Sequence, residues 1–176
     1  GLSHPTSGRS ELMGTSKDKQ GFREAVRRTG SLIEGPALYG RATARQNMEI
    51  YAAAKGVVKS KEEISRLLDL VGLTDRASTK AAGFSLGMKQ RLGLAIALIG
   101  NPELVILDEP TNGLDPSGIV EIRELIMSLP EKGTTVLVSS HLLSEVEIMC
   151  DRATIIDKGS LVADGSIDEI LSQSGA

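Results

Sequence analysis

Two adjacent carboxylates, Asp108 and Glu109, follow four aliphatic residues in the stretch "LVILDE". Such a run is typical of a buried parallel strand, and ligands of open α/β sheets bind at the carboxyl ends of those strands. Because successive side chains of a strand point to opposite faces, the two acids cannot easily share one proton. We expect separate tasks instead, one acid holding a metal and the other addressing a water molecule. Mg²⁺ fits best, since it binds through one or two carboxylates plus phosphate oxygens.

Four more residues could complete a phosphate site around these acids. Ser85 and Gly87 lie where a helix begins, and a helix N-terminus attracts anions. Asp115 closes a tight turn just past the carboxylates, and His141 follows the next strand along the chain. Each feature has a plainer interpretation, namely an ordinary helix cap, an ordinary histidine, or two solvated acids at a surface turn. Only their combination favours phosphate chemistry.

The elements that must position these residues can be read from the patterns around them. "ELVIL" and "TTVLVSS" predict two strands, and the helix between them has Asp115 as N-cap and Pro116 as first residue. Strands that alternate with helices of this length pair in parallel through right-handed crossovers. A strand around "RSELM", a helix around "GFREAVRRTG" and a strand at "SLI" precede them.

The middle of the chain predicts helices, and its end predicts a hairpin. Capping boxes at Thr43–Gln46 and Ser60–Glu63 begin two helices, and a third runs from Ser85 to "NP". The second helix repeats apolar residues at helical spacing and stops at a glycine, the residues being Ile64, Leu67, Leu68, Val71 and Gly72. Near the end, Lys158-Gly159 joins two strands, and a capping box at Ser166–Glu169 begins a last helix.

Composition limits the possible partners. With 176 residues and 40% apolar content, the chain can form one compact unit with an aliphatic core, because aromatic residues make up only 2%. A net charge of −3 gives no basic field for a nucleic-acid backbone. The single cysteine, Cys150, favours a reducing compartment and a packing role. The longest apolar run, Leu92 to Gly100, is too short to span a membrane, so membrane association needs a partner.

In order and spacing, "FSLGMKQR", "LVILDEP", "NGLD" and "SSH" resemble the signature motif, Walker B strand, D-loop and switch histidine of ABC-transporter ATPase domains. The resemblance covers essentially the whole chain, and "SLIEGPALYGRATARQNMEIY" is most similar to bacitracin-type peptide exporters. It implies an α/β fold, a P-loop NTPase-type three-layer core with a mostly parallel sheet, plus an α-helical subdomain. Residues 1–34 would begin the core, 35–100 would form the helical subdomain, and 101–176 would hold the catalytic part.

The resemblance also implies a role for each candidate residue. Asp108 would hold Mg²⁺, Glu109 would polarise the attacking water, and His141 would contact the γ-phosphate of ATP. Ser85 and Gly87 would bind the nucleotide of a second copy in a head-to-tail dimer, with Asp115 at that interface. The dimer would work with transmembrane permease subunits to export antimicrobial peptides or drugs, or to provide immunity to them. It would be cytoplasmic and lie peripherally on the inner face of the cell membrane.

The chain departs from the family pattern in three places. The signature reads Phe84-Ser85-Leu86-Gly87-Met88, which loses one glycine of the usual Leu-Ser-Gly-Gly-Gln. Glu34 stands where the family has the glutamine of the Q-loop, and its carboxylate could still contact the metal or a water. No G-x-x-x-x-G-K-[ST] phosphate-binding run is present. We therefore expect an N-terminally truncated ATPase that lacks the first strand and helix of the core and is inactive alone.

Two other functions are compatible with these motifs. A non-transport ABC ATPase could act on DNA or ribosomes, although the acidic chain has no basic extension. A binding or regulatory module could also have lost its ATPase activity, but the retained Glu109 and His141 argue against that. The transported compound and the membrane partner are not encoded in these residues.

Overall fold

A three-stranded parallel sheet forms the centre of the computed structural model, which describes residues 5–57 and 61–174. The strands are β3 (Thr29–Leu32), β4 (Leu104–Asp108) and β5 (Thr135–Ser139), in the order β3-β4-β5. The predicted parallel pairing is confirmed: Leu32 aligns with Leu107, and Leu107 with Val138. Val105 and Leu107 of the middle strand are 0% exposed. Burial of these aliphatic residues fixes β4 in the core.

The outer edge of β5 differs from β4. Among the residues that the structure describes, no strand pairs with β5 on the side away from β4. Leu137, in the middle of β5, is 57% exposed. The sequence of β5 is rich in β-branched and apolar residues, but β5 is an edge strand of this sheet rather than a central one.

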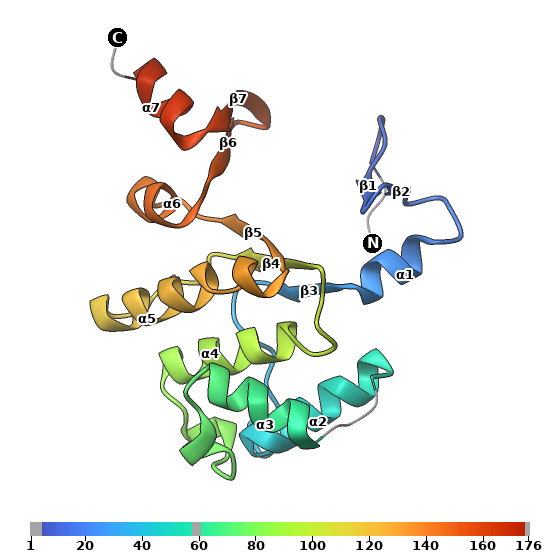
Figure 1. Cartoon of the computed structure of the whole chain (residues 1–176), viewed down its shortest axis with the longest axis vertical. Helices are drawn as coiled ribbons and strands as arrows, with labels where there is room; N and C mark the ends of the chain where they lie inside the picture. Colours follow the sequence, from blue (N-terminus) through green and yellow to red (C-terminus); the bar gives the residue numbers. More distant parts are fainter. Residues whose placement is uncertain (1–4, 58–60, 175–176) are drawn as a thin grey trace. The chain divides into compact units, whose positions relative to one another are not determined.

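Three helices gather beside the sheet in the first of two compact units, residues 1–139 (Figure 1). They are α2 (Ala44–Lys55), α3 (Lys61–Leu70) and α4 (Leu86–Ala97). The capping box of Thr43 and Gln46 is confirmed, whereas the one predicted at Ser60 lies outside the described residues. All four predicted apolar residues of the α3 face are buried, and Gly72 ends that helix with a φ of 65°.

Helix α4 lies between the sheet and the other two helices, with β3 on one side and α2 and α3 on the other (Figure 1). Residues 92–99 are all buried, because the helix has neighbours on several sides. Lys55 holds the helix end by donating hydrogen bonds to the carbonyl oxygens of Ala97 and Ile99, at 3.3 and 3.2 Å. Burial lowers the pKa of the Lys55 ammonium.

Two glycines allow close packing around α4. A Cβ atom on Gly30 of β3 would lie 2.1 Å from the carbonyl oxygen of Ala97, and one on Gly93 would lie 2.6 Å from Cβ of Pro36. Both distances are far below van der Waals contact. The helix therefore rests directly on the strand and on the loop that follows it.

Shorter elements complete the first unit. They are β1 (Glu11–Leu12) and β2 (Thr15–Ser16), which pair antiparallel, α1 (Phe22–Arg27), α5 (Pro116–Met127), and the 3₁₀ helices η1 (Thr74–Arg76), η2 (Ala81–Gly83) and η3 (Pro130–Lys132). The predicted strand near "RSELM" is thus only one arm of a small hairpin. Asp115 is at the N-cap position of α5 and Pro116 is the first helical residue, as predicted, although the Asp115 side chain makes no capping hydrogen bond.

The second unit, residues 140–176, contains α6 (Leu143–Met149), β6 (Arg152–Asp157), β7 (Ser160–Ser166) and α7 (Ile167–Ser174). The antiparallel hairpin of β6 and β7 turns at Lys158-Gly159, where both residues have positive φ. The capping box of Ser166 and Glu169 is confirmed by two reciprocal hydrogen bonds of 3.2 and 2.8 Å. Turn and capping chemistry that is local in sequence therefore forms as predicted.

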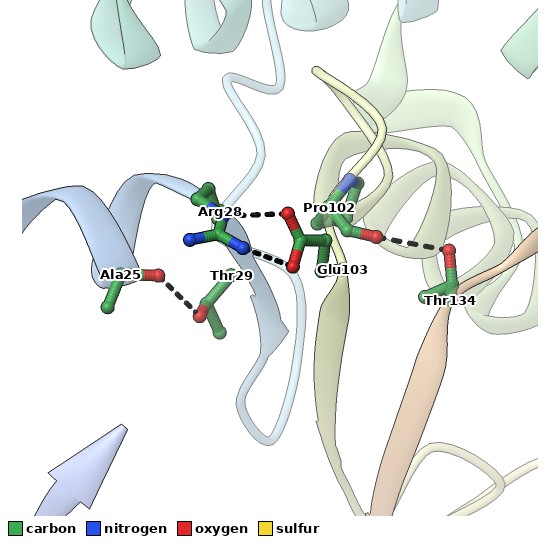
Figure 2. Close-up of polar contacts among 6 residues, drawn as sticks. All are labelled: Ala25, Arg28, Thr29, Pro102, Glu103 and Thr134. Atoms are coloured by element: carbon green, nitrogen blue, oxygen red, sulfur yellow. Dashed lines mark hydrogen bonds and ion pairs between the residues drawn. The ribbon is translucent and has the colours of Figure 1, made fainter. Parts of the chain in front are cut away.

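An Arg28–Glu103 pair joins the amino ends of β3 and β4 (Figure 2). The guanidinium donates through Nε to Oε1 at 2.7 Å and through Nη2 to Oε2, a bidentate arrangement. At the same end of the sheet, Thr134 Oγ1 donates to the carbonyl oxygen of Pro102 at 3.1 Å. These contacts connect the residues that precede the three strands.

Acidification is expected to remove the contribution of this pair. The hydrogen bond from Arg28 and the attraction of its charge hold the pKa of the Glu103 carboxyl below its usual value of 4.5. The folded chain therefore releases this proton at a lower pH than the unfolded chain. The stabilisation is fully present above the unfolded-state pKa and is lost as the pH falls through the folded-state pKa.

Urea unfolding measured from neutral to acidic pH checks this expectation. Wild-type protein should lose stability in that window, and Glu103→Gln should lose less, because it has no proton to take up. Glu131→Gln, which removes an exposed carboxylate of the same unit, is the matched control and should keep the wild-type slope. Equal acid dependence in wild type and Glu103→Gln would contradict the assignment.

Candidate functional site

The two acids stand at the junction between a strand and a turn. Asp108 is the last residue of β4, and Glu109 lies outside the strand with a φ of 48°. The prediction that both acids share one strand is therefore wrong for Glu109, and strand alternation does not set its direction. A non-glycine residue in the left-handed region costs on the order of 1–3 kcal/mol and persists only where its surroundings enforce it. Such strain is concentrated at functional sites.

Ser139 contacts both acids from the neighbouring strand. It is the register partner of Asp108 in the parallel pair of β4 and β5. Its hydroxyl donates a hydrogen bond to Oδ1 of Asp108 and accepts one from the amide of Glu109 at 3.1 Å. The same amide also points to the carbonyl oxygen of Ser139 at 3.2 Å. Ser139 was not among the predicted site residues, because its alignment with Asp108 comes from the register of the two strands.

Helix α4 holds the other side of the turn. Gln90 is 2% exposed, and its Nε2 donates to the carbonyl oxygen of Pro110, the residue after Glu109, at 3.2 Å. Pro110 and Thr111 are themselves buried. The turn closes with the amide of Asn112 donating to the carbonyl oxygen of Glu109 at 3.1 Å. The helix that begins at the predicted anion site is thus tied to the segment that carries the two acids.

The two predicted interface segments lie side by side. A Cβ atom on Gly113 would lie 3.1 Å from Cδ2 of Leu86, and one on Gly87 would lie 3.8 Å from Cδ2 of Leu114. Ser85 is the N-cap of α4 and accepts from the amide of Met88 at 3.2 Å. The extra leucine of the altered signature therefore packs toward the turn while remaining 47% exposed. These contacts bring Ser85 and Gly87 near Asp115, whose Oδ2 accepts from Ser117 Oγ at 2.8 Å.

Glu34 lies at the carboxyl edge of the same sheet. It follows β3 in the left-handed region, with a φ of 55°, and is exposed. Two residues later, Pro36 rests against the position of Gly93 in α4. The loop of Glu34 is therefore anchored to the helix that also holds the carboxylate turn.

His141 and Cys150 belong to the second unit, so they are described only locally. His141 is exposed and precedes α6, where the amide of Leu142 donates to Ser140 Oγ at 3.1 Å. Cys150 is half-buried, and burial raises the pKa of its thiol. A raised pKa disfavours the reactive thiolate, in line with a packing role.

The oxygen donors at the turn fit a hard cation. They are the carboxylate of Asp108, which accepts from Ser139, and the carboxylate of Glu109, the next residue in the chain. The described part of the chain holds no group of three or more His, Cys, Asp or Glu residues suited to a metal. Mg²⁺ needs no such group, because it takes one or two carboxylates and fills its shell with phosphate oxygens and water. The donors therefore fit Mg²⁺ bound together with a phosphate ligand.

Comparison with protein families gives a match to the family model described as "ABC transporter" over residues 1–112. The bacitracin transport ATP-binding protein BcrA of Bacillus licheniformis is 47% identical over 171 residues, covering 97% of this chain and 55% of the relative. The lantibiotic transport ATP-binding protein SrtF of Streptococcus pyogenes is 45% identical, covering 96% of this chain and 71% of the relative.

An uncharacterized ABC transporter ATP-binding protein of Bacillus subtilis, YhcH, is also 47% identical, with 57% of its length covered. The chain therefore spans about half the length of several curated relatives that it matches.

Solved structures agree with the fold. The cbiO1 protein of Clostridium perfringens, described as part of the ABC transporter complex cbiONQ, superposes with a TM-score of 0.84 at 26% identity, covering 99% of this chain and 72% of that one. An ATP-binding subunit of an ABC transporter gives 0.82 at 34% identity, covering 99% and 73%. In the part of the chain that the structure describes, no helix has the length and apolar character needed to cross a bilayer.

Proposed function

Because this chain belongs to the ABC transporter family of ATP-binding proteins, we propose that it is the ATP-binding part of an exporter that couples ATP hydrolysis to transport. One observation carries the proposal. Ser139 and Gln90 hold the turn that follows Asp108 from two sides, and the turn keeps Glu109 in a strained backbone conformation. Ligands of parallel α/β sheets bind at the carboxyl ends of the strands, and phosphoryl transfer to water needs a positioned metal ligand and a positioned group for the water.

In this proposal the two acids act separately. Asp108 holds Mg²⁺, and Glu109 polarises the attacking water. Bound Mg²⁺ would neutralise charge on the ATP phosphates, which is the chemistry that the metal supplies. Glu34 would reach the metal or a water from the end of β3. His141 would contact the γ-phosphate.

We further propose that a second copy completes each site. Ser85 and Gly87 would meet the nucleotide of the partner in a head-to-tail dimer, with Asp115 at the interface. The positions of Leu86 beside Gly113 and of Gly87 beside Leu114 support this proposal, because they place the two segments side by side. The helices of residues 35–100 would form the subdomain that docks on transmembrane permease subunits at the inner face of the cell membrane.

The transported compound is proposed from the relatives. Both BcrA and SrtF are described as transport ATP-binding proteins, for bacitracin and for a lantibiotic. Both compounds are peptide antibiotics, so export of, or immunity to, an antimicrobial peptide is the activity that these similarities favour.

Nucleotide binding is the direct test. The 176 residues contain no G-x-x-x-x-G-K-[ST] run, so they lack the backbone cradle and lysine that hold the β- and γ-phosphates. We expect this chain alone to bind ATP no tighter than about 1 mM and to show no turnover. The whole protein, meaning a form that also carries such a loop, should bind MgATP and hydrolyse it. Both expectations can be checked by calorimetry. Micromolar binding of ATP by the chain alone would contradict the first, and no binding of MgATP by the whole protein would contradict the proposed function.

A further inference from the structure

We propose that Ser139 is a positioning residue for both acids, orienting the carboxylate of Asp108 and fixing the backbone of Glu109. Its hydroxyl has one proton to donate, which goes to Oδ1 of Asp108, and lone pairs that accept the amide proton of Glu109. A hydroxyl is the smallest side-chain group that can do both at once. This inference rests on the proposed function, in which the two acids serve Mg²⁺ and water.

The contact to Asp108 restricts the carboxylate. An ionised carboxylate has two oxygens and accepts several hydrogen bonds, so without a donor it can rotate among several orientations. The hydrogen bond from Ser139 holds Oδ1 and thereby limits the positions that Oδ2 can take. Partners of this kind commonly improve metal affinity by roughly 10- to 100-fold. The register of Asp108 with Ser139 keeps the two side chains together at the end of their strands.

The contact to Glu109 supports the unusual backbone. The amide of Glu109 points to two oxygens of Ser139, its hydroxyl at 3.1 Å and its carbonyl at 3.2 Å. Both bonds hold the peptide plane between Asp108 and Glu109, and that plane fixes the start of the turn. One residue of β5 therefore sets the directions of both acids.

Packing does not account for the serine. Ser139 is exposed, so replacing it with alanine leaves no cavity in the core. The loss is confined to the two hydrogen bonds of the hydroxyl. This separation makes the role testable, because a change at the acids need not accompany a large change in stability.

Four variants separate the hydroxyl from other effects. Ser139→Ala removes it, Ser139→Thr keeps it, and Ser139→Val has the shape of threonine without the hydroxyl. Ser128→Ala is the matched control, because the Ser128 hydroxyl also donates one hydrogen bond, to the carbonyl oxygen of Leu125 at 2.8 Å. Thermal unfolding of each variant shows how much stability it loses.

The first measurement is the affinity of the whole protein for Mn²⁺ in the presence of ATP. The electron paramagnetic resonance signal of free Mn²⁺ reports how much of the metal is unbound. We expect Ser139→Ala and Ser139→Val to weaken binding by roughly tenfold, and Ser139→Thr to restore it to near the wild-type value. Ser128→Ala should bind like wild type. Equal affinity in Ser139→Ala and wild type, or equal affinity in the valine and threonine variants, would overturn the metal role.

The second measurement needs no nucleotide and uses the 176-residue chain. NMR measures the rate of hydrogen exchange at the backbone amide of Glu109. This rate should become roughly fivefold faster in Ser139→Ala and return toward the wild-type rate in Ser139→Thr. If wild-type whole protein fails to bind Mn²⁺ with ATP, the proposed function falls while this exchange result still decides the role of Ser139. Unchanged exchange at Glu109 in Ser139→Ala would overturn the positioning of its backbone.

Discussion

Glu109→Gln is expected to lower ATP turnover by the whole protein by roughly 10²- to 10⁴-fold, the usual effect of losing a positioned general base. Glutamine keeps the size of the side chain and can still contact a water, but it cannot accept the proton. The backbone of Glu109 is held by Ser139 and by the turn, so the substitution should leave the local structure in place. The expected loss is therefore in kcat, with nucleotide affinity preserved.

Steady-state hydrolysis assays and nucleotide titrations check this split between turnover and binding. Glu124→Gln, which removes an exposed carboxylate of α5, is the matched control and should hydrolyse ATP like wild type. A Glu109→Gln protein with wild-type turnover would remove Glu109 from the proposed role. Loss of nucleotide binding in that variant would instead indicate that the acid supports the ligand rather than the water.

The largest loss of stability is expected from Gly30→Ala. Its new Cβ atom would lie 2.1 Å from the carbonyl oxygen of Ala97 and 2.9 Å from the carbonyl carbon. Both are backbone atoms, so no side-chain rotation can relieve the clash, and α4 must move away from β3. We expect a loss of about 3 kcal/mol, at the upper end for overpacking, and a fall in Tm of about 10 °C.

Calorimetric or urea unfolding of the chain measures this loss. Gly83→Ala is the matched control, because no atom lies within 4 Å of the added methyl group. It should unfold within about 0.5 kcal/mol of wild type, as surface substitutions usually do. A Gly30→Ala protein as stable as the control would mean that α4 does not rest on β3 as described.

The features that could be predicted from the sequence depend on residues close together in the chain. The capping boxes of Thr43 and Ser166 act over three residues, and the α3 face repeats over one or two turns. Parallel pairing also follows from local patterns, because alternating strands and helices leave few other topologies. The aliphatic run before Asp108 was sufficient to place this acid at the end of a strand.

The features that sequence reasoning missed depend on register between distant segments. Ser139 reaches Asp108 across 31 positions, and nothing in "TTVLVSS" alone indicates which residue aligns with the acid. The left-handed backbone of Glu109 is equally invisible, because glutamate has no preference for that region and tertiary contacts impose it. The broad burial of α4 likewise comes from neighbours on several sides rather than from its own pattern.

The exposed edge of β5 has a consequence for handling the chain. Within the described residues, its outer backbone amides and carbonyls have no partner strand, and Leu137 is largely exposed beside them. Natural proteins usually protect such edges with charges, prolines or a covering segment, because an open edge recruits strands from other molecules. Residues 135–139 contain no charge and no proline. Two copies of this chain at high concentration can therefore pair through the open edges of their β5 strands. Aggregation, rather than folding, would then limit its purification.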